Sequence, residues 1–135
     1  MSIEWIVFDL GGVVVHTDTS RLFQLLARCC NNEPEDIQSA LDGLVVFGTP
    51  MLPPLGDQYH LGLVDTERFL ETICAALPCP ATLDDVRDAW LSILTGENSE
   101  TVAIMDKLAP RYPLACLSNT NALHWEYMAQ RWPRI

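Results

Sequence analysis

The chain has 135 residues, of which 49% are hydrophobic and 19% charged, a composition typical of a globular domain. Its formal net charge of −10 disfavours nucleic acid and anionic membranes as partners. The longest apolar run is far shorter than a membrane span, and the amino terminus lacks the basic region of a signal peptide.

The first predicted element is a strand over Ile3 to Phe8, a run that is nearly all apolar. Such a run is typical of a strand buried on both faces, as in a parallel sheet covered by helices. Amphipathic patterns then predict four helical segments, at Ser20–Cys30, Pro34–Leu44, Thr66–Leu77 and Leu83–Leu94. The starts of these four segments carry capping signals, which are Asp18 or Thr19, Pro34, Asp65 and the capping box of Thr82 and Asp85. The Pro- and Gly-rich stretch between the second and third is expected to be irregular apart from a short helix around Leu55–Leu61.

The last third of the chain predicts a helix, a strand and a helix. Ser99 is expected to cap the first of these helices, which connects the insert to the second strand. That strand is predicted over Leu114–Leu117 and is expected to be buried, and the final helix is predicted over Asn121–Trp132. This order predicts an α/β protein with a Rossmann-like parallel sheet core, of which two strands are present, and an inserted helical-bundle cap. We assign residues 1–16 and 96–135 to the core and residues 17–95 to the cap.

Polar residues follow both predicted strands, where an open α/β sheet binds its ligands. Asp9 could act there as a nucleophile or bind a hard cation. Gly11 and Gly12 can turn N–H groups toward an anion, and Ser118 and Asn119 can donate hydrogen bonds to a phosphoryl group. Taken singly, each of these features is also typical of ordinary turns and caps.

The combination of "VFDLGGVVV", a helical insert and "LACLSNTN" resembles the haloacid dehalogenase superfamily of hydrolases. It resembles the subclass with a helical cap after the first motif, and in particular the members similar to sugar-phosphate phosphatases. The resemblance implies a Mg²⁺-dependent phosphatase that acts on a small phosphorylated metabolite through an aspartyl-phosphate. It implies that Asp9 is the nucleophile and binds Mg²⁺ with the Gly11 carbonyl, and that Ser118, Asn119 and Gly12 hold the phosphoryl group.

Two departures from the superfamily pattern carry expectations of their own. Gly11 stands where most of these phosphatases have a second acid, so the proton donor is unassigned, with His16 and Asp18 nearby in sequence. Lys107 precedes the second motif and does not match the lysine of the third, and the acids of the fourth motif are missing. We therefore expect a chain truncated after the second motif, an incomplete Mg²⁺ site and little activity of these residues alone.

Two alternatives remain open at this point. The first is a 2-haloacid dehalogenase-like enzyme, in which Arg21 or Arg28 would receive the halide. The second is a non-catalytic module that binds a partner or self-associates, and an exposed sheet edge predicts a possible homo-oligomer.

The remaining residues yield weaker expectations. The five cysteines, without C-x-x-C spacing, predict reduced and buried thiols in a cytoplasmic protein. The four tryptophans are expected to be packing residues, and His60 and His124 to be surface or helix residues. In the Pro- and Gly-rich part of the insert, Met51, Gln58 or Tyr59 could contact the leaving group.

Overall fold

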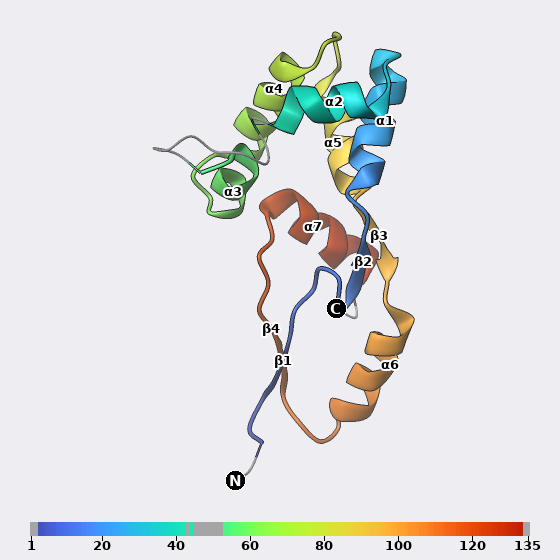
Figure 1. The fold of residues 1–135 in the computed structure, drawn as a ribbon. Coiled ribbons are helices and arrows are strands. Elements are labelled where there is room, and N and C mark those ends of the chain that lie inside the picture. Colours follow the sequence, from blue (N-terminus) through green and yellow to red (C-terminus); the bar gives the residue numbers. More distant parts are fainter. Residues whose placement is uncertain (1–2, 43, 45–52, 134–135) are drawn as a thin grey trace.

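The computed structural model describes residues 3–42, 44 and 53–133, and within them the chain forms two small sheets and seven helices (Figure 1). Strand β1 (Ile6–Phe8) pairs in parallel with β4 (Leu114–Cys116). Strand β2 (Val15–Thr17) pairs antiparallel with β3 (Leu94–Glu97). The predicted α/β class, with a small parallel sheet and a helical portion, is confirmed.

Five helices form the portion that we call the cap: α1 (Ser20–Cys30), α2 (Pro34–Leu41), α3 (Leu55–His60), α4 (Thr66–Ala76) and α5 (Leu83–Leu91). They gather at one end of the molecule in Figure 1. Two of the predicted caps are confirmed by their hydrogen bonds. The carboxylate of Asp65 accepts the Arg68 N–H at 2.8 Å, and Thr82 and Asp85 form a reciprocal capping box. These local bonds satisfy helix-end N–H groups that would otherwise lack a partner.

The cap has its own apolar core, in which Phe69 is completely buried. The Phe69 ring stacks on Tyr59 with centroids 4.3 Å apart and meets Trp90 edge-on at 4.6 Å. These three aromatic side chains therefore connect α3, α4 and α5 by direct packing.

A second, smaller cluster lies beside the parallel strands and consists of Leu10, Val14, Val15, Leu94 and Met128. It joins the turn after β1 to the β2–β3 pair and to α7 (Ala122–Arg131). Helix α6 (Ser99–Leu108) crosses from β3 to β4, and α7 lies between the parallel pair and the cap in Figure 1. The segment after β4 runs from the parallel pair to the first turn of α7, which lies beside the cap (Figure 1).

The β2–β3 pair was not predicted from the sequence. The segments "VHT" and "LTGE" are short and partly polar, so their pairing depends on a contact between distant parts of the chain. Helix α5 accordingly ends at Leu91 instead of reaching Leu94. The predicted boundaries at residues 16/17 and 95/96 fall inside these two strands, and the division into core and cap stays a prediction.

One capping expectation was wrong. Helix α6 is capped by Asn98, whose side-chain oxygen accepts the N–H groups of Glu100 and Thr101, and Ser99 is its first helical residue. At α1 the N-cap position is Thr19, but its side chain makes no capping bond. The Asp18 carboxylate accepts the Ser20 N–H at 3.0 Å, which agrees with the expectation of Asp18 or Thr19 at this helix start.

The expectation of reduced, buried cysteines was wrong for most of them. Cys30, at the end of α1, forms a disulfide with Cys79 in the α4–α5 connection. Cys29 and Cys116 are exposed, and Cys74 is half-buried. Because stable disulfides are typical of oxidising compartments, the cysteines no longer support a cytoplasmic location, which stays a prediction.

Several large apolar side chains near the parallel strands are exposed. Val7 on β1 is 57% exposed and Leu117, just after β4, is 77% exposed. Trp5 and Trp125 are 62% and 49% exposed, so the expectation that all four tryptophans are packing residues was wrong for these two. Self-association through the exposed edge of the parallel sheet stays a prediction, which light scattering can test. Among the described residues, no helix combines the length and apolarity needed to cross a bilayer.

Candidate functional site

The parallel pairing of β1 and β4 brings the two predicted motifs together. Phe8 lies opposite Cys116, and the Leu117 N–H donates to the Phe8 carbonyl at 2.9 Å. Asp9 directly follows β1 and Ser118 comes two residues after the end of β4, so both leave the sheet at the same edge. The edge at which parallel strands end is where open α/β sheets bind ligands.

A cavity of about 320 Å³ lies at this edge, and we call it the Asp9 cavity; its lining residues are Asp9, Gly11, Leu117, Ser118 and Asn119. Oδ1 of Asp9 accepts the Leu10 N–H at 2.7 Å, which fixes the orientation of the carboxylate. Within the described part of the chain Oδ2 of Asp9 makes no hydrogen bond, so it remains open to a ligand. The structure thus places four of the five predicted site residues around one cavity, while their chemical roles stay predictions.

The fifth predicted residue, Gly12, is not among the residues that line the Asp9 cavity. Its N–H donates to the Val15 carbonyl at 2.8 Å, so in this conformation the amide is engaged within the loop. A phosphate contact from this N–H would therefore require the loop to open. Its predicted phosphate role has no support from this geometry.

Gly11 and Gly12 are expected to respond differently to substitution by alanine. Gly12 has φ = 75°, a left-handed conformation, so Gly12→Ala should destabilise the protein by about 1–2 kcal/mol. A Cβ on Gly11 would meet only Thr17 Cγ2, at 4.0 Å, so Gly11→Ala should change stability by less than about 0.5 kcal/mol. Urea denaturation of both variants measures the difference, and equal effects would contradict this interpretation of the loop.

The Asp9 cavity has a donor set that fits Mg²⁺ only in part. It offers one carboxylate, from Asp9, and the backbone carbonyl of Gly11. Mg²⁺ prefers such oxygen ligands and usually retains several waters and a substrate phosphate. Within the described residues, no group of three or more His, Cys, Asp or Glu side chains could hold a metal ion. The residues present therefore fit a weak Mg²⁺ site completed by water and substrate.

A second cavity, of about 410 Å³, adjoins the first on the side of the cap, and we call it the α3 cavity. It shares Ser118 and Asn119 with the Asp9 cavity and is also lined by Pro53, Asp57, His60, Leu61 and Thr120. Partial burial lowers the pKa of His60, and the charge of the nearby Asp57 carboxylate opposes that shift. Sequence reasoning missed Asp57 and His60, because no spacing in the sequence connects α3 with the segment after β4.

The residues expected to contact a leaving group lie elsewhere. Met51 falls outside the described residues. Gln58 donates to the Pro53 carbonyl at 2.8 Å, and Tyr59 is buried with its hydroxyl bonded to Thr66. Neither Gln58 nor Tyr59 lines the α3 cavity, whereas their neighbours Asp57 and His60 do.

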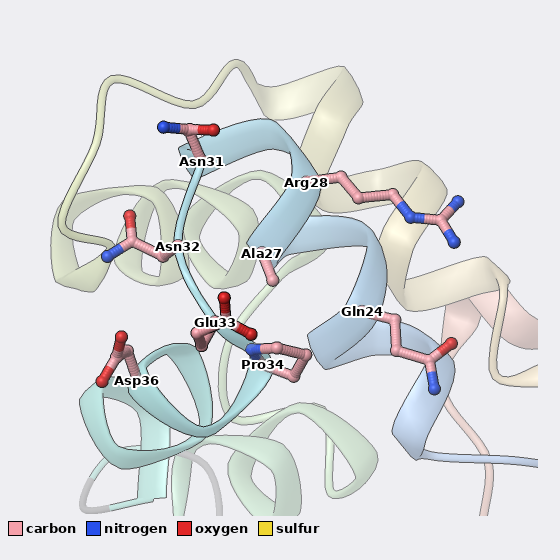
Figure 2. A pocket seen from close by; sticks show the side chains of 8 residues that line it. All are labelled: Gln24, Ala27, Arg28, Asn31, Asn32, Glu33, Pro34 and Asp36. Atoms are coloured by element: carbon pink, nitrogen blue, oxygen red, sulfur yellow. The ribbon is translucent and has the colours of Figure 1, made fainter.

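The other candidate residues are not brought to the Asp9 cavity. His16 is exposed on β2, and the Asp18 carboxylate is bonded to Ser20, so neither lines the site as a proton donor. Arg28 lines a cavity of about 710 Å³ between α1 and α2, on the cap (Figure 2). Arg21 lines another, beside α5 and Tyr127. Among the described residues, no cation that could receive a halide lines the Asp9 cavity.

No family model matches the chain, but solved structures share its fold. A HAD family enzyme from Bacteroides thetaiotaomicron, in complex with magnesium and inorganic phosphate, has 22% sequence identity and a TM-score of 0.76 over 96% of this chain. A predicted HAD-like family hydrolase from Porphyromonas gingivalis has 30% identity and a TM-score of 0.66 over 90% of this chain. The chain spans 59% of the first protein's length and 53% of the second's. The predicted resemblance to this superfamily is confirmed.

Proposed function

From the premise that this chain has the fold of haloacid dehalogenase superfamily hydrolases, we propose that its chemistry is that of a Mg²⁺-dependent phosphatase. The substrate would be a small phosphorylated metabolite, and Asp9 would be the nucleophile. The observation that carries this proposal is the shared lining of one cavity by Asp9, Gly11, Ser118 and Asn119 at the ends of two parallel strands. The magnesium and phosphate bound by the Bacteroides enzyme support the same chemistry.

The proposed reaction has two steps. In the first, Oδ2 of Asp9 attacks the phosphorus atom, the bond from phosphorus to the leaving oxygen breaks, and that oxygen takes up a proton. The Leu10 N–H holds Oδ1 during this step, which keeps the attacking oxygen aimed into the cavity. In the second step, a water attacks the phosphorus of the aspartyl-phosphate, releasing phosphate and a proton and restoring the Asp9 carboxylate.

Ser118 and Asn119 would bind the transferring group. The Ser118 hydroxyl and the Asn119 amide line the Asp9 cavity and can donate hydrogen bonds to phosphoryl oxygens. Asp9 and the Gly11 carbonyl would hold Mg²⁺, which supplies positive charge that offsets the negative charge of the phosphoryl group. No cationic side chain among the described residues lines this cavity, so we expect slow turnover from these 135 residues alone.

The leaving group would occupy the α3 cavity. The two cavities share Ser118 and Asn119 and are therefore adjacent, so we expect the leaving group of a phosphomonoester bound at Asp9 to extend toward α3. Asp57 and His60 would offer hydrogen-bonding groups there, and Leu61 and Pro53 an apolar surface. This mixed lining suits a small polar metabolite.

Phosphoryl transfer to Asp9 can be tested without multiple turnover. The chain is incubated with Mg²⁺ and acetyl phosphate, and intact-mass spectrometry measures the mass added by one phosphoryl group. We expect slow labelling of the wild type, mapped to Asp9 by peptide analysis, and background labelling of Asp9→Asn. The acyl-phosphate should be removed by hydroxylamine, as the chemistry of a carboxylate nucleophile requires.

Asp36→Asn is the matched control, because Asp36 is an exposed acid on α2 that lines the cavity of Figure 2, between α1 and α2. It should be labelled like the wild type. Equal labelling of Asp9→Asn would refute the nucleophile assignment. Rapid multiple turnover of a phosphomonoester, lost in Asp9→Asn, would instead uphold the chemistry and refute the expectation of slow turnover.

A further inference from the structure

The cap holds the first turn of α7 through a direct hydrogen bond. The Leu123 N–H donates to the phenolic oxygen of Tyr59 at 3.2 Å, across 64 positions of sequence. The same oxygen is bonded to the Thr66 hydroxyl at 2.8 Å, which ties it to the start of α4. Because the first N–H groups of a helix have no partner within the helix, this bond satisfies a donor that α7 could not satisfy alone. The cap is thus bonded to the helix that directly follows Ser118–Thr120.

His124 makes a second connection between α7 and the cap. Its Nε2 lies 3.0 Å from the Trp90 carbonyl, at the end of α5, and its ring stacks on the Trp90 ring with centroids 5.6 Å apart. A carbonyl only accepts hydrogen bonds, so Nε2 must carry a hydrogen. His124 is a helix residue, which was one of the two expectations for it, and it is buried, with 9% exposure.

The other ring nitrogen of His124 faces a donor. Nδ1 lies 3.4 Å from Nδ2 of Asn121, while Oδ1 of Asn121 accepts the His124 N–H at 2.9 Å as the cap of α7. The capping bond fixes which end of the Asn121 amide faces the ring, so Nδ1 can only accept. The neutral ring with its hydrogen on Nε2 therefore satisfies both partners, and a second hydrogen on Nδ1 would face the Asn121 N–H group.

We propose that His124 and Tyr59 form a pH-sensitive latch that holds the Ser118–Asn119 loop against the cap. Neutral His124 bonds α5 to α7, and Tyr59 bonds α3 to the same turn of α7. Gain of a proton by His124 breaks its bond with Asn121 and weakens the first turn of α7, which continues directly into the loop shared by both cavities. The claim that this loop binds phosphate rests on the proposed function, whereas the latch itself does not.

The direction of the pH effect follows from the surroundings of His124. Burial lowers the pKa of His124 below 6.5, the Trp90 carbonyl opposes the shift, and the charge of His60 on α3 adds to it. No carboxylate is among the groups that shift it; Asn121 and Trp90, which contact it directly, are neutral. A group whose folded-state pKa is lowered contributes its stability above its unfolded value. The latch should therefore hold above pH 6.5 and be lost as the pH falls through the folded-state pKa of His124.

Hydrogen exchange of single backbone amides, followed by NMR, tests the latch in the full chain. As the pH falls from about 7.5 through the titration of His124, we expect the protection factors of Leu123 and His124 to fall about tenfold, the effect of losing one hydrogen bond of about 1.4 kcal/mol. Those of Phe69 and Ile73 in α4 should stay constant over that range. The His124 ring-proton chemical shifts, measured in the same samples, should change with the same midpoint pH as the protection factors.

Matched variants separate His124 from the other two histidines. His16→Gln/His60→Gln keeps His124 alone and should retain the pH response, whereas His124→Gln should lose it and show pH-independent protection. Tyr59→Phe keeps the ring stacked on Phe69 but removes the acceptor for Leu123, so its Leu123 protection should fall about tenfold even at about pH 7.5.

The latch is refuted by a pH response that persists in His124→Gln, or by protection that does not follow the His124 titration. If His124→Gln does not fold, the wild-type titration and Tyr59→Phe still decide the matter. None of these readouts requires phosphoryl transfer. Failure of Asp9 labelling with an intact pH response would therefore overturn the proposed function and leave the latch standing.

Discussion

Replacing Phe69 with alanine is expected to lower the free energy of unfolding by about 3–5 kcal/mol, as large-to-small changes at buried aromatic positions do. Phe69 is completely buried and packs against both Tyr59 and Trp90. Its removal leaves a void between these two rings, so α3, α4 and α5 lose their common contact. Urea denaturation followed by circular dichroism measures the change.

Leu63→Ala is the control for this substitution, because Leu63 is 63% exposed. Its effect should stay within about 0.5 kcal/mol. The total stability of a domain is only about 5–15 kcal/mol, so Phe69→Ala is also expected to unfold at a clearly lower temperature. A change of less than about 1 kcal/mol for Phe69→Ala would contradict the central place of this ring in the cap.

Loss of the Cys30–Cys79 disulfide is expected to destabilise the chain by about 2–4 kcal/mol. The bond connects positions 49 residues apart, so it restricts a long loop in the unfolded chain. Longer loops are stabilised more in the chain-entropy account, which gives roughly 4 kcal/mol for this one. Thermal unfolding with and without a reductant, and of Cys30→Ala/Cys79→Ala, measures the effect.

Cys29→Ala provides the comparison, since Cys29 is an exposed free cysteine adjacent to Cys30. It should unfold like the wild type and remain sensitive to reductant. Equal stability of the oxidised and reduced wild type would remove any structural role for the bond. The double-alanine variant should not respond to reductant.

The parts of the fold that were predictable depend on neighbours in the sequence. Helix α4 begins after Asp65 because that carboxylate accepts an N–H three residues away, and Thr82 and Asp85 do the same for α5. The apolar runs of β1 and β4 identify strands, and parallel pairing follows from the helical connection between them. The predicted burial on both faces was wrong, because Val7 on β1 is 57% exposed and Cys116 on β4 is exposed. The meeting of Asp9 and Ser118 is a consequence of that pairing, so this half of the site was available from the sequence.

Other features depend on contacts between distant residues, which no local pattern carries. The β2–β3 pair joins Val15 to Glu97, and the disulfide joins Cys30 to Cys79. His60 enters the α3 cavity because the folded cap sets α3 beside the segment after β4. His124 resembles any polar helix residue in the sequence, and its burial appears only when α7 packs on Trp90.

The sequence by itself therefore determined the helices with local caps, the two strands of the parallel pair and the two motifs that follow them. Hydrogen bonds within a few residues and the period of apolar side chains are sufficient to specify such elements. Only the tertiary structure decided which cap residues face Asp9, which cysteines are bonded and which histidine is buried. These outcomes depend on how separate elements pack, since burial and distance are properties of the assembled fold.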